Sequence, residues 1–367
     1  MKRVFILNDK ASGGGAEAVM RDLVSHLHSK YEITVMTLDD DYTSFQKIFP
    51  GDVTYIPAKI KENHYRRIDP RRYMVAFRNY LRKVAIRRQK YDVVISNKEG
   101  PCMLLASAMK ADRKLSWVHV DYEYLYWTYW TFSPAKEVAC MQQFDHVICV
   151  SQAAANSVKK VIGDPGNLCV RYNPINYRSI LKNAEEPVDL ARDDSKPLFV
   201  AVGRIVEQKN FVAFAKVCAR LSREFDFEVW IVGDGEQRRD VEQVLEQENC
   251  NCVRILGMQS NPHKYLSKAD FLVSTTLGES YGLVIQEALS LGVPVLSTRC
   301  PAIEECLDSG FGMLVDCSEE AIEAGMRQIL EHPECIAAYK KNIADHYDTE
   351  SLWEYRLQQI EELISAV

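Results

Sequence analysis

The chain has no hydrophobic run long enough to span a membrane or to form the core of a signal peptide. Its first apolar run, VFIL at residues 4–7, is far shorter than the roughly 20 residues of a transmembrane helix. The sequence therefore predicts a protein that starts in the cytosol. Low-complexity tracts and short repeats are also missing, and a hydrophobic share of 47% with a charged share of 26% is typical of globular proteins.

The cysteines follow neither a disulfide scaffold nor a zinc site. Eleven are scattered along the chain, mostly within apolar runs, and no CxxC pair occurs. The Cys250-Asn251-Cys252 spacing does not fit a zinc knuckle. We expect reduced thiols, no metal and no cofactor. The run Asp39-Asp40-Asp41 imitates a metal-binding DxD motif, but it follows a strand of the first half, and we interpret it as a solvated loop.

The length and the pattern of short runs predict two α/β domains. At 367 residues the chain exceeds the size at which single cores stop growing. Short β-branched runs alternate with helical patterns, which favours parallel sheets flanked by helices. The expected strands are 4–7, 33–37, 53–57, 92–96, 115–120 and 146–150, then 198–203, 228–233, 253–257, 271–275 and 294–298.

A break in this alternation divides the chain. Residues 173–197 include an acidic, proline-bearing stretch and are the candidate linker. We predict an N-terminal domain over 1–177, a C-terminal domain over 178–349, and a helix over 350–367 that packs back toward the first domain. Both domains are expected to be doubly wound and Rossmann-like, and to face one another across a cleft where ligands bind at the carboxyl ends of the strands.

The first half carries a strongly basic segment. Between Lys59 and Lys90 there are 12 Lys or Arg residues against Glu62 and Asp69 only, although the net charge of the whole chain is -6. One interpretation is a solvated helix face. The other is contact with anionic phospholipid or a lipid-linked diphosphate. Nucleic acid is a weaker option, because no aromatic residues are interleaved in the manner of RNA-binding motifs.

The stretch at residues 274–298 points to a nucleotide-sugar site. A strand ends near Thr276, a Gly-Glu-Ser-Tyr-Gly turn follows, and a helix then begins. A diphosphate needs positive potential, which the first N–H groups of a helix supply, and Gly282 lets the backbone approach closely. The carboxylates of Glu279 and Glu287 can accept hydrogen bonds from sugar and ribose hydroxyls. Alternatively, Glu279 caps the helix and Glu287 is solvated.

The Glu-x7-Glu pair, followed by Gly-Val-Pro-Val, resembles the retaining glycosyltransferases of family 4, which have the GT-B architecture. The resemblance covers nearly the whole chain. VAVGRIVEQKN at 200–210 resembles the start of the family's donor domain, which implies that Arg204 and Lys209 neutralise the leaving diphosphate. Preorganised cations there stabilise the transition state more than the ground state. GGGAEAVMRDLV resembles the family's glycine-rich loop, with Gly14 and Gly15 making room for phosphate.

The resemblance also implies that His119, after a strand of the first half, binds the donor sugar near its 6-hydroxyl. Retaining transfer in such enzymes is a same-face substitution, so no protein nucleophile is expected. The loop after Gly257 is expected to contact the base. The predicted catalytic residues are His119, Arg204, Lys209 and Glu279, and the predicted donor-binding residues are Gly14, Gly15, Arg204, Lys209, Met258, Glu279, Ser280, Tyr281, Gly282, Leu283 and Glu287.

An unusual aromatic segment follows His119. Residues 122–132 hold three Tyr at 122, 124 and 126, then Trp127, Tyr129, Trp130 and Phe132. One interpretation is a buried packing cluster. The other is a loop that contacts the acceptor or a membrane, because sugars stack on aromatic faces and Tyr and Trp suit headgroup depth.

Taken together, the sequence predicts a metal-independent, retaining hexosyl- or N-acetylhexosaminyl-transferase. The C-terminal domain would bind the nucleotide-sugar donor, with UDP as the commoner nucleotide, and the N-terminal domain would bind a glycan or lipid-linked acceptor in surface polysaccharide or glycoconjugate synthesis. The expected location is the cytoplasm, at the inner face of the cell membrane. Two alternatives are a catalytically silent paralogue that serves as a scaffold and a nucleotide-sugar epimerase. Donor sugar, acceptor, linkage and oligomeric state cannot be read from the sequence.

Overall fold

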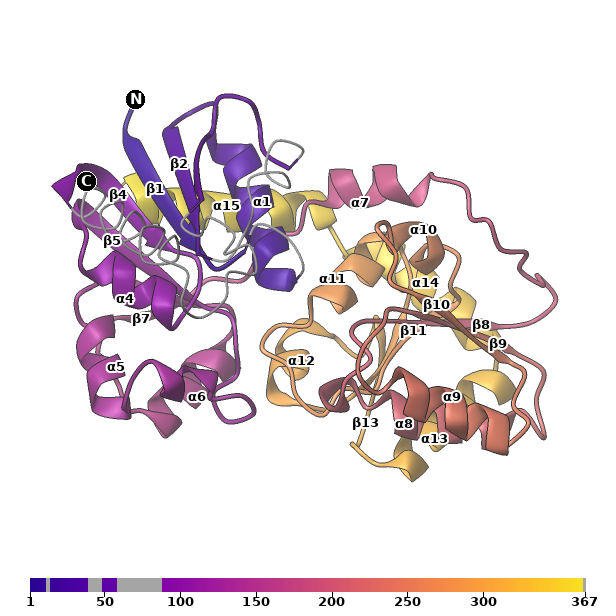
Figure 1. Ribbon diagram of the computed structural model, residues 1–367. Helices are drawn as coiled ribbons and strands as arrows, with labels where there is room; N and C mark the ends of the chain where they lie inside the picture. Colours follow the sequence, from indigo (N-terminus) through magenta and orange to yellow (C-terminus); the bar gives the residue numbers. More distant parts are fainter. Residues whose placement is uncertain (11–13, 39–47, 58–87, 366–367) are drawn as a thin grey trace, which may run out of the picture. The chain divides into compact units, whose positions relative to one another are not determined.

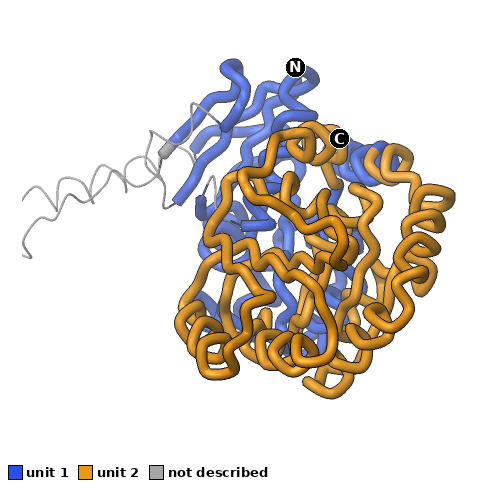
Figure 2. The backbone as a smooth tube through the Cα atoms, turned by 90° about the vertical axis from the view of Figure 1, so that its right-hand side faces the viewer, with its two compact units in different colours: residues 1–174, 354–367 blue, residues 175–353 orange. Residues whose placement is uncertain are grey.

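The computed structural model describes residues 1–10, 14–38, 48–57 and 88–365. The chain forms two compact units, which Figure 2 shows in different colours. Unit 1 comprises Met1–Pro174 with Glu354–Val367, and unit 2 comprises Ile175–Trp353. The boundaries expected from the sequence were 177/178 and 349/350. Most of the basic segment 59–90 and all of Asp39-Asp40-Asp41 lie outside the described residues.

Unit 1 is built on a parallel sheet of seven strands, in the order β3-β2-β1-β4-β5-β6-β7 (Figure 1). Buried apolar side chains dominate the central strands, as in β1, where every residue after Arg3 is buried, because helices cover both faces of such a sheet. The strands are β1 (Arg3–Asn8), β2 (Glu32–Thr37), β3 (Thr54–Pro57), β4 (Lys90–Ser96), β5 (Lys110–Val118), β6 (His146–Cys149) and β7 (Leu168–Val170).

The described helices of unit 1 begin where the sequence provides start signals. Ser151 accepts a hydrogen bond from the backbone N–H of Ala154 at 2.9 Å and so caps its helix, and two other helices begin with Pro101 and Pro134. The elements are α1 (Gly15–Leu27), α4 (Pro101–Ser107), the 3-10 turn η1 (Trp127–Trp130), α5 (Pro134–Met141), α6 (Gln152–Val161) and the greater part of α15 (Thr349–Ser365).

The helix α15 packs into unit 1, far from its place in the sequence. Its buried side chains include Leu357 and Ile360. Glu361 accepts hydrogen bonds from His26 on α1 and from Lys30, each at 2.5 Å. In Figure 1 this helix lies beside β1 and α1. Through these contacts the last helix of the chain packs on α1 of unit 1.

Unit 2 contains a parallel sheet of six strands, in the order β10-β9-β8-β11-β12-β13. Alternate residues of β8 point into two separate cores: Phe199 and Ala201 into one, Leu198 and Val200 into the other. A strand buried on both faces is therefore apolar throughout. The strands are β8 (Leu198–Val202), β9 (Glu228–Val232), β10 (Val253–Gly257), β11 (Phe271–Ser274), β12 (Val295–Thr298) and β13 (Gly312–Val315).

The helices of unit 2 cover both faces of this sheet. They are α7 (Tyr177–Ala184), the 3-10 turn η2 (Glu207–Lys209), α8 (Phe211–Leu221), α9 (Arg238–Gln247), α10 (His263–Leu266), α11 (Leu283–Ser290), α12 (Pro301–Cys306), α13 (Glu319–Glu331) and α14 (Glu334–His346). None of the helices within the described ranges combines the length and hydrophobicity needed to cross a bilayer.

The structure confirms the predicted α/β class with two Rossmann-like parallel sheets, but three details differ. The prediction missed β7 and β13, which lie at sheet edges and are only three and four residues long. The proposed linker at 173–197 is also wrong in part, because residues 177–184 form α7. Asn176 caps this helix by accepting a hydrogen bond from the Ser179 N–H at 3.2 Å.

Candidate functional site

In each sheet the strand order reverses beside the first strand of the unit. In unit 2 the first strand β8 lies between β9 and β11, and in unit 1 the first strand β1 lies between β2 and β4. Connections leave such neighbouring strands in opposite directions, which opens a crevice at their carboxyl ends where ligands of doubly wound sheets bind. The predicted site residues follow these strands.

Lys209 and Glu279 form an ion pair at the reversal point of unit 2. Lys209 ends η2, after β8, and Glu279 lies between β11 and α11. Their side chains are 21% and 13% exposed, so the pair is partly withdrawn from water, where it is screened less than a surface pair. The structure thus brings together two residues that are 70 positions apart in the sequence.

Backbone contacts fix the loops that carry this ion pair. The Gln208 side chain donates a hydrogen bond to the Gly278 carbonyl at 2.7 Å, and the Leu277 N–H donates to the Gln208 carbonyl at 2.8 Å. The Thr275 hydroxyl donates to the Lys209 carbonyl at 2.8 Å. These bonds join η2 to the turn after β11, so Lys209 and Glu279 are held on a common frame.

Arg204 also follows β8, but its side chain is exposed. Its guanidinium makes no hydrogen bond or ion pair with any residue in the described part of the chain. The adjacent Gly203 packs closely on β9: a Cβ added to Gly233 would lie 1.8 Å from the Gly203 carbonyl oxygen. The backbone before Arg204 is therefore held in place, and the Arg204 guanidinium is available to an anionic ligand.

The N-terminus of α11 lies next to Glu279. Gly282 is its N-cap residue and adopts a left-handed conformation with φ +77°, which favours glycine. A Cβ at this position would lie 2.7 Å from Cδ1 of the buried Ile303. The first N–H groups of a helix lack intrahelical acceptors, so the backbone at Leu283 offers donors and a positive dipole end to an anion.

The other predicted donor residues of unit 2 occupy different positions. Tyr281 is buried, Ser280 and Leu283 are half-buried, and Met258, at the end of β10, is 70% exposed. Strand β10 is separated from β8 by β9. Met258 therefore belongs to the same carboxyl edge as Lys209, although to a more distant part of it.

Glu287 contacts a histidine that the sequence analysis did not single out. The His263 Nε2 atom lies 3.5 Å from the Glu287 carboxylate, and the other ring nitrogen lies 3.3 Å from the Asn183 amide. Glu287 is thus not a solvated surface residue. His263 begins α10, a four-residue helix with no marked sequence pattern, so only the fold reveals the pair.

In unit 1, Gly14 and Gly15 start α1 after β1. Gly14 is the N-cap residue and is extended, with φ -145°, so glycine is not required there for a left-handed conformation. A Cβ on Gly14 would meet the Glu17 carboxylate at 2.5 Å. The glycine therefore gives room to Glu17 in this structure.

A partly buried charge cluster joins the ends of β1 and β4 to α1 at the reversal point of unit 1. The Lys98 ammonium lies 2.6 Å from Asp9 and 3.5 Å from Glu17. Burial alone would lower the pKa of Lys98, but the hydrogen bond that Lys98 donates to Asp9 and the negative charges of Asp9 and Glu17 outweigh it and raise that pKa. Lys98 thus stays charged. Lys98 was not predicted from the sequence, although the polar run Asn97-Lys98-Glu99 directly after a buried strand was a usable signal.

His119 directly follows β5, and its environment keeps the imidazole neutral. Burial, with a smaller effect from the Lys98 charge, lowers its pKa to about 3. Its Nε2 atom is buried and makes no hydrogen bond with any described residue. A neutral imidazole can donate or accept one hydrogen bond to a sugar hydroxyl, but it cannot serve as a cation at neutral pH.

Glu99 connects His119 to the aromatic segment. This fully buried carboxylate accepts hydrogen bonds from the His119 backbone N–H at 3.0 Å and from the Trp127 indole at 2.9 Å. Burial raises the pKa of Glu99. Because one side chain holds both groups, the position of His119 depends on the turn η1.

The aromatic segment is divided between packing and exposure. Tyr122, Tyr126 and Thr128 each donate a hydrogen bond to the buried Glu137, at 2.7, 3.0 and 2.9 Å. On the outside, Tyr129 and Trp130 are 54% and 81% exposed and stack with ring centroids 4.6 Å apart. The packing interpretation thus holds for the inner side chains, and the outer ones remain available for contact.

Comparison with protein-family models identifies the family to which the chain belongs. Residues 13–178 match the model described as Glycosyltransferase Family 4, and residues 196–332 match the model described as Glycosyl transferases group 1. The two matches follow one another and together take up most of the chain. The chain belongs to the family 4 glycosyltransferases. The resemblance inferred from the motifs is therefore confirmed.

Curated relatives in this family share part of the chain. A Campylobacter jejuni N-acetylgalactosamine-N,N'-diacetylbacillosaminyl-diphospho-undecaprenol 4-alpha-N-acetylgalactosaminyltransferase is 29% identical over 175 residues, which cover 47% of this chain and 46% of that protein. The Rhizobium meliloti lipopolysaccharide core biosynthesis glycosyltransferase LpsE is 25% identical over 276 residues, which cover 74% of both. The chain thus spans about half the length of the first relative.

Solved structures show the same fold. HepE of Anabaena, in complex with UDP and glucose, matches with a TM-score of 0.77 at 16% identity, and the match covers 100% of both chains. WaaG, a glycosyltransferase involved in lipopolysaccharide biosynthesis, matches with a TM-score of 0.69 at 17% identity over 100% of both chains. The family member described here therefore has the GT-B fold.

Proposed function

We propose that this protein transfers a hexosyl or N-acetylhexosaminyl group, with retention, from a UDP-sugar to a glycan or lipid-linked acceptor in polysaccharide or glycoconjugate synthesis. One observation carries the proposal: the Lys209–Glu279 ion pair beside the N-terminus of α11, with the exposed Arg204 after the same strand as Lys209. Support for UDP comes from HepE, whose structure contains UDP and glucose.

The proposed binding mode assigns each charge to one part of the donor. Arg204, Lys209 and the first N–H groups of α11 would receive the diphosphate, on which negative charge develops as the glycosidic bond breaks. Glu279 would accept hydrogen bonds from sugar hydroxyls, and Glu287, held beside His263, from the ribose hydroxyls. Lys209 then exchanges one carboxylate partner for two phosphates, while Glu279 gains hydroxyl donors.

His119 would hydrogen-bond to the donor sugar near its 6-hydroxyl, as the family resemblance implies. Its neutral state suits an uncharged hydroxyl. Gly14 and Gly15 would leave room for phosphate at the start of α1. No nucleophile on the protein is needed for a same-face substitution, in which the leaving phosphate assists deprotonation of the acceptor.

We further propose that the reaction needs no metal ion, because three groups of the protein already supply positive potential to the diphosphate. Among the described residues no group of three or more His, Cys, Asp or Glu side chains is placed to hold a metal. Transfer should continue at an undiminished rate in excess EDTA. A loss of activity that Mg²⁺ or Mn²⁺ restores would contradict this part of the proposal.

The activity is tested with a panel of nucleotide-sugars and detection of released nucleoside diphosphate. Arg204→Ala should lower kcat/KM by about 10²–10³, the usual effect of losing a charge-stabilising group. Glu279→Ala should also lower kcat/KM, because the sugar hydroxyls lose their carboxylate acceptor. Glu331→Ala and Arg239→Ala, which alter exposed residues of unit 2 outside the site, are the matched controls. Equal activity in all four variants would reject the site, and a wild type that binds no nucleoside diphosphate would favour the scaffold alternative.

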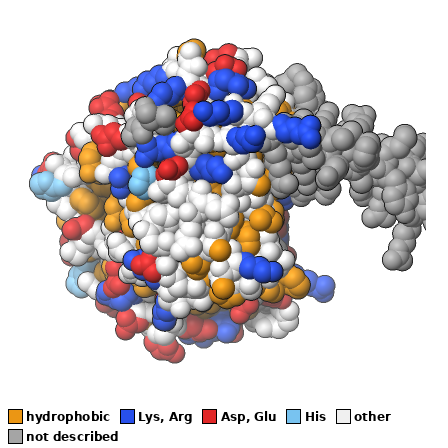
Figure 3. Space-filling view, turned by 90° about the vertical axis from the view of Figure 1, so that its left-hand side faces the viewer, with side chains coloured by type: hydrophobic (Ala, Val, Ile, Leu, Met, Phe, Trp, Pro, Cys, Tyr) orange, Lys and Arg blue, Asp and Glu red, His pale blue; other side chains and the backbone are white. Residues whose placement is uncertain are grey.

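A second part of the proposal is that unit 1 meets the anionic inner face of the cell membrane, where a lipid-linked acceptor resides. Tyr124, Leu125, Tyr129 and Trp130 are exposed around η1, and Trp and Tyr partition to the headgroup region. Exposed hydrophobic side chains interspersed with Lys and Arg also appear on the face in Figure 3. The basic segment 59–90 would add electrostatic attraction.

Cosedimentation with vesicles tests this contact. Binding should be stronger to vesicles with anionic phospholipid than to zwitterionic vesicles, and Trp130→Ala should weaken it severalfold. Tyr355→Ala is the control, because Tyr355 is another exposed aromatic residue of unit 1, on α15. If Trp130→Ala and Tyr355→Ala bind alike, the aromatic turn does not contact the bilayer.

A further inference from the structure

Two thiols lie against one another where the chain passes from α9 into β10. The Sγ atoms of Cys250 and Cys252 are 3.4 Å apart. Asn249 adopts a left-handed conformation with φ +51°, and the Cys250 N–H donates a hydrogen bond to the Leu245 carbonyl at 2.9 Å. This turn ends α9 and directs both side chains to the same side, so the fold itself places the two sulfur atoms together.

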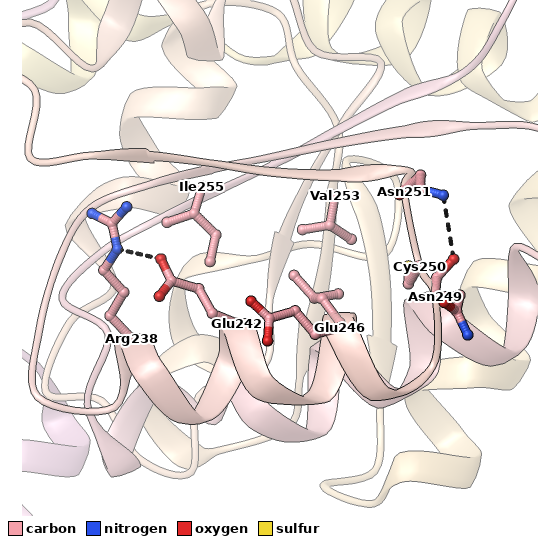
Figure 4. A pocket seen from close by; sticks show the side chains of 9 residues that line it. Arg238, Glu242, Glu246, Asn249, Cys250, Asn251, Val253 and Ile255 are labelled. Carbon is pink, nitrogen blue, oxygen red and sulfur yellow. Dashed lines mark hydrogen bonds and ion pairs between the residues drawn. The ribbon is translucent and has the colours of Figure 1, made fainter.

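Cys250 lines a groove that is open to solvent. Figure 4 shows this open groove between α9 and β10, with Cys250 at one end beside Asn249 and Asn251. Strand β10 is at the edge of its sheet, and the lining residues Val253 and Ile255 come from that strand. Cys250 is 7% exposed, and its position in the lining of the groove is the route by which a molecule as small as a peroxide would approach it.

The immediate surroundings favour a thiolate at Cys250. The hydrogen bond from Cys252 lowers the pKa of Cys250 to about 6, and burial opposes this effect only in part. The same interaction, with burial, raises the pKa of Cys252. The hydroxyl of Ser222, the residue directly after helix α8, lies 3.9 Å from the Cys250 sulfur. A thiolate next to a protonated thiol is the arrangement that thiol oxidation requires.

We propose that Cys250 and Cys252 form a reversible oxidation site that takes hydrogen peroxide as its co-reactant. The Cys250 thiolate attacks one peroxide oxygen, the O–O bond breaks, and hydroxide leaves, which gives a sulfenic acid on Cys250. The Cys252 sulfur then attacks the Cys250 sulfur, the S–O bond breaks, and the thiol proton leaves with the oxygen as water. Two thiols and one peroxide thus yield one disulfide and two waters.

The geometry explains why these two sulfurs should react with each other. A disulfide bond is about 2.0 Å long, so the sulfurs, now 3.4 Å apart, need only a small approach by side-chain rotation. Only Asn251 separates the two residues, and such a short ring is strained, which makes a disulfide easier to reduce. The site is therefore expected to cycle between dithiol and disulfide and not to be a permanent cross-link.

One tryptic peptide isolates the pair. Cleavage after Arg239 and Arg254 releases residues 240–254, which contain Cys250 and Cys252 and no other cysteine. The native wild-type protein is treated with an equimolar amount of hydrogen peroxide, alkylated and digested. The peptide should lose the mass of two hydrogen atoms and both alkylation sites, and dithiothreitol given before alkylation should restore them.

Cys317 serves as an internal control, because it is the exposed cysteine among those described and follows a different strand. In Cys252→Ser the peptide should instead carry a sulfenic acid on Cys250 that reacts with dimedone. The proposal is overturned if Cys317 is oxidised first while peptide 240–254 keeps two alkylatable thiols, or if Cys250 forms a disulfide with another cysteine. Neither result depends on the transferase activity proposed above.

Discussion

Replacing Gly282 by alanine adds one methyl group at the start of α11, and the structure allows its cost to be divided into two parts. The first is conformational, because Gly282 has φ +77°, and a left-handed backbone costs a residue with a Cβ about 1–2 kcal/mol. The second is steric, because the methyl group would lie 2.7 Å from Cδ1 of Ile303. Overpacking of this kind costs about 1–3 kcal/mol.

Gly292 provides the matched control at the other end of the same helix. Its φ is +71°, but a Cβ at this position would meet nothing within 4 Å. Gly292→Ala should therefore carry the conformational cost alone, about 1–2 kcal/mol. Gly282→Ala should lower the free energy of unfolding of unit 2 by about 2–5 kcal/mol in total. Urea unfolding followed by circular dichroism compares the two variants with the wild type.

Nucleotide binding should separate the variants further. To relieve the contact with the buried Ile303, the first turn of α11 must move, and its N–H groups are the proposed diphosphate donors. Calorimetry should show a loss of UDP affinity of at least about tenfold for Gly282→Ala, or 1.4 kcal/mol, with little change for Gly292→Ala. Equal stability and equal UDP affinity in the two variants would refute the reasoning.

Two further predictions use pH. Burial lowers the pKa of His119 to about 3, so the charged imidazole is disfavoured in the folded protein. The stability of the wild type should therefore fall relative to that of His119→Asn as the pH drops from the ordinary histidine pKa of about 6.5 toward 3. Urea unfolding midpoints at about pH 7 and pH 5 measure this difference. Burial raises the pKa of Glu137, so its charged carboxylate costs stability in the folded protein at pH values above the ordinary pKa of a glutamate. The free energy of unfolding of the wild type should therefore rise relative to that of Glu137→Gln as the pH falls toward that ordinary pKa. Parallel stability curves for the two proteins would count against this.

The parts of the candidate site that follow one another along the chain could be predicted from the sequence. Glu279, Gly282 and the start of α11 form a continuous motif, and Lys209 follows β8 at a distance typical of a short loop. Their types and order were sufficient to place them at a strand end. The contact between Lys209 and Glu279 could not be predicted from residue types alone, because it depends on β8 and β11 being neighbours.

The features that were not predicted from the sequence are those that depend on tertiary contacts. Lys98 pairs with Asp9 only because β4 is placed beside β1. His263 reaches Glu287 from a short helix without a periodic pattern. Glu137 accepts hydrogen bonds from three hydroxyl groups of the aromatic segment. Chemically similar side chains of this segment therefore take buried or exposed positions that their spacing in the sequence does not distinguish.

The return of α15 to unit 1 has a consequence for the order of folding during synthesis. Its residues Leu357 and Ile360 belong to a core whose other parts were translated before residues 175–353. A nascent chain emerging from the ribosome can therefore complete unit 2 first, while the apolar surface of unit 1 that α15 will cover is still exposed. Chaperone demand should then be concentrated on the part of the protein that is made earliest.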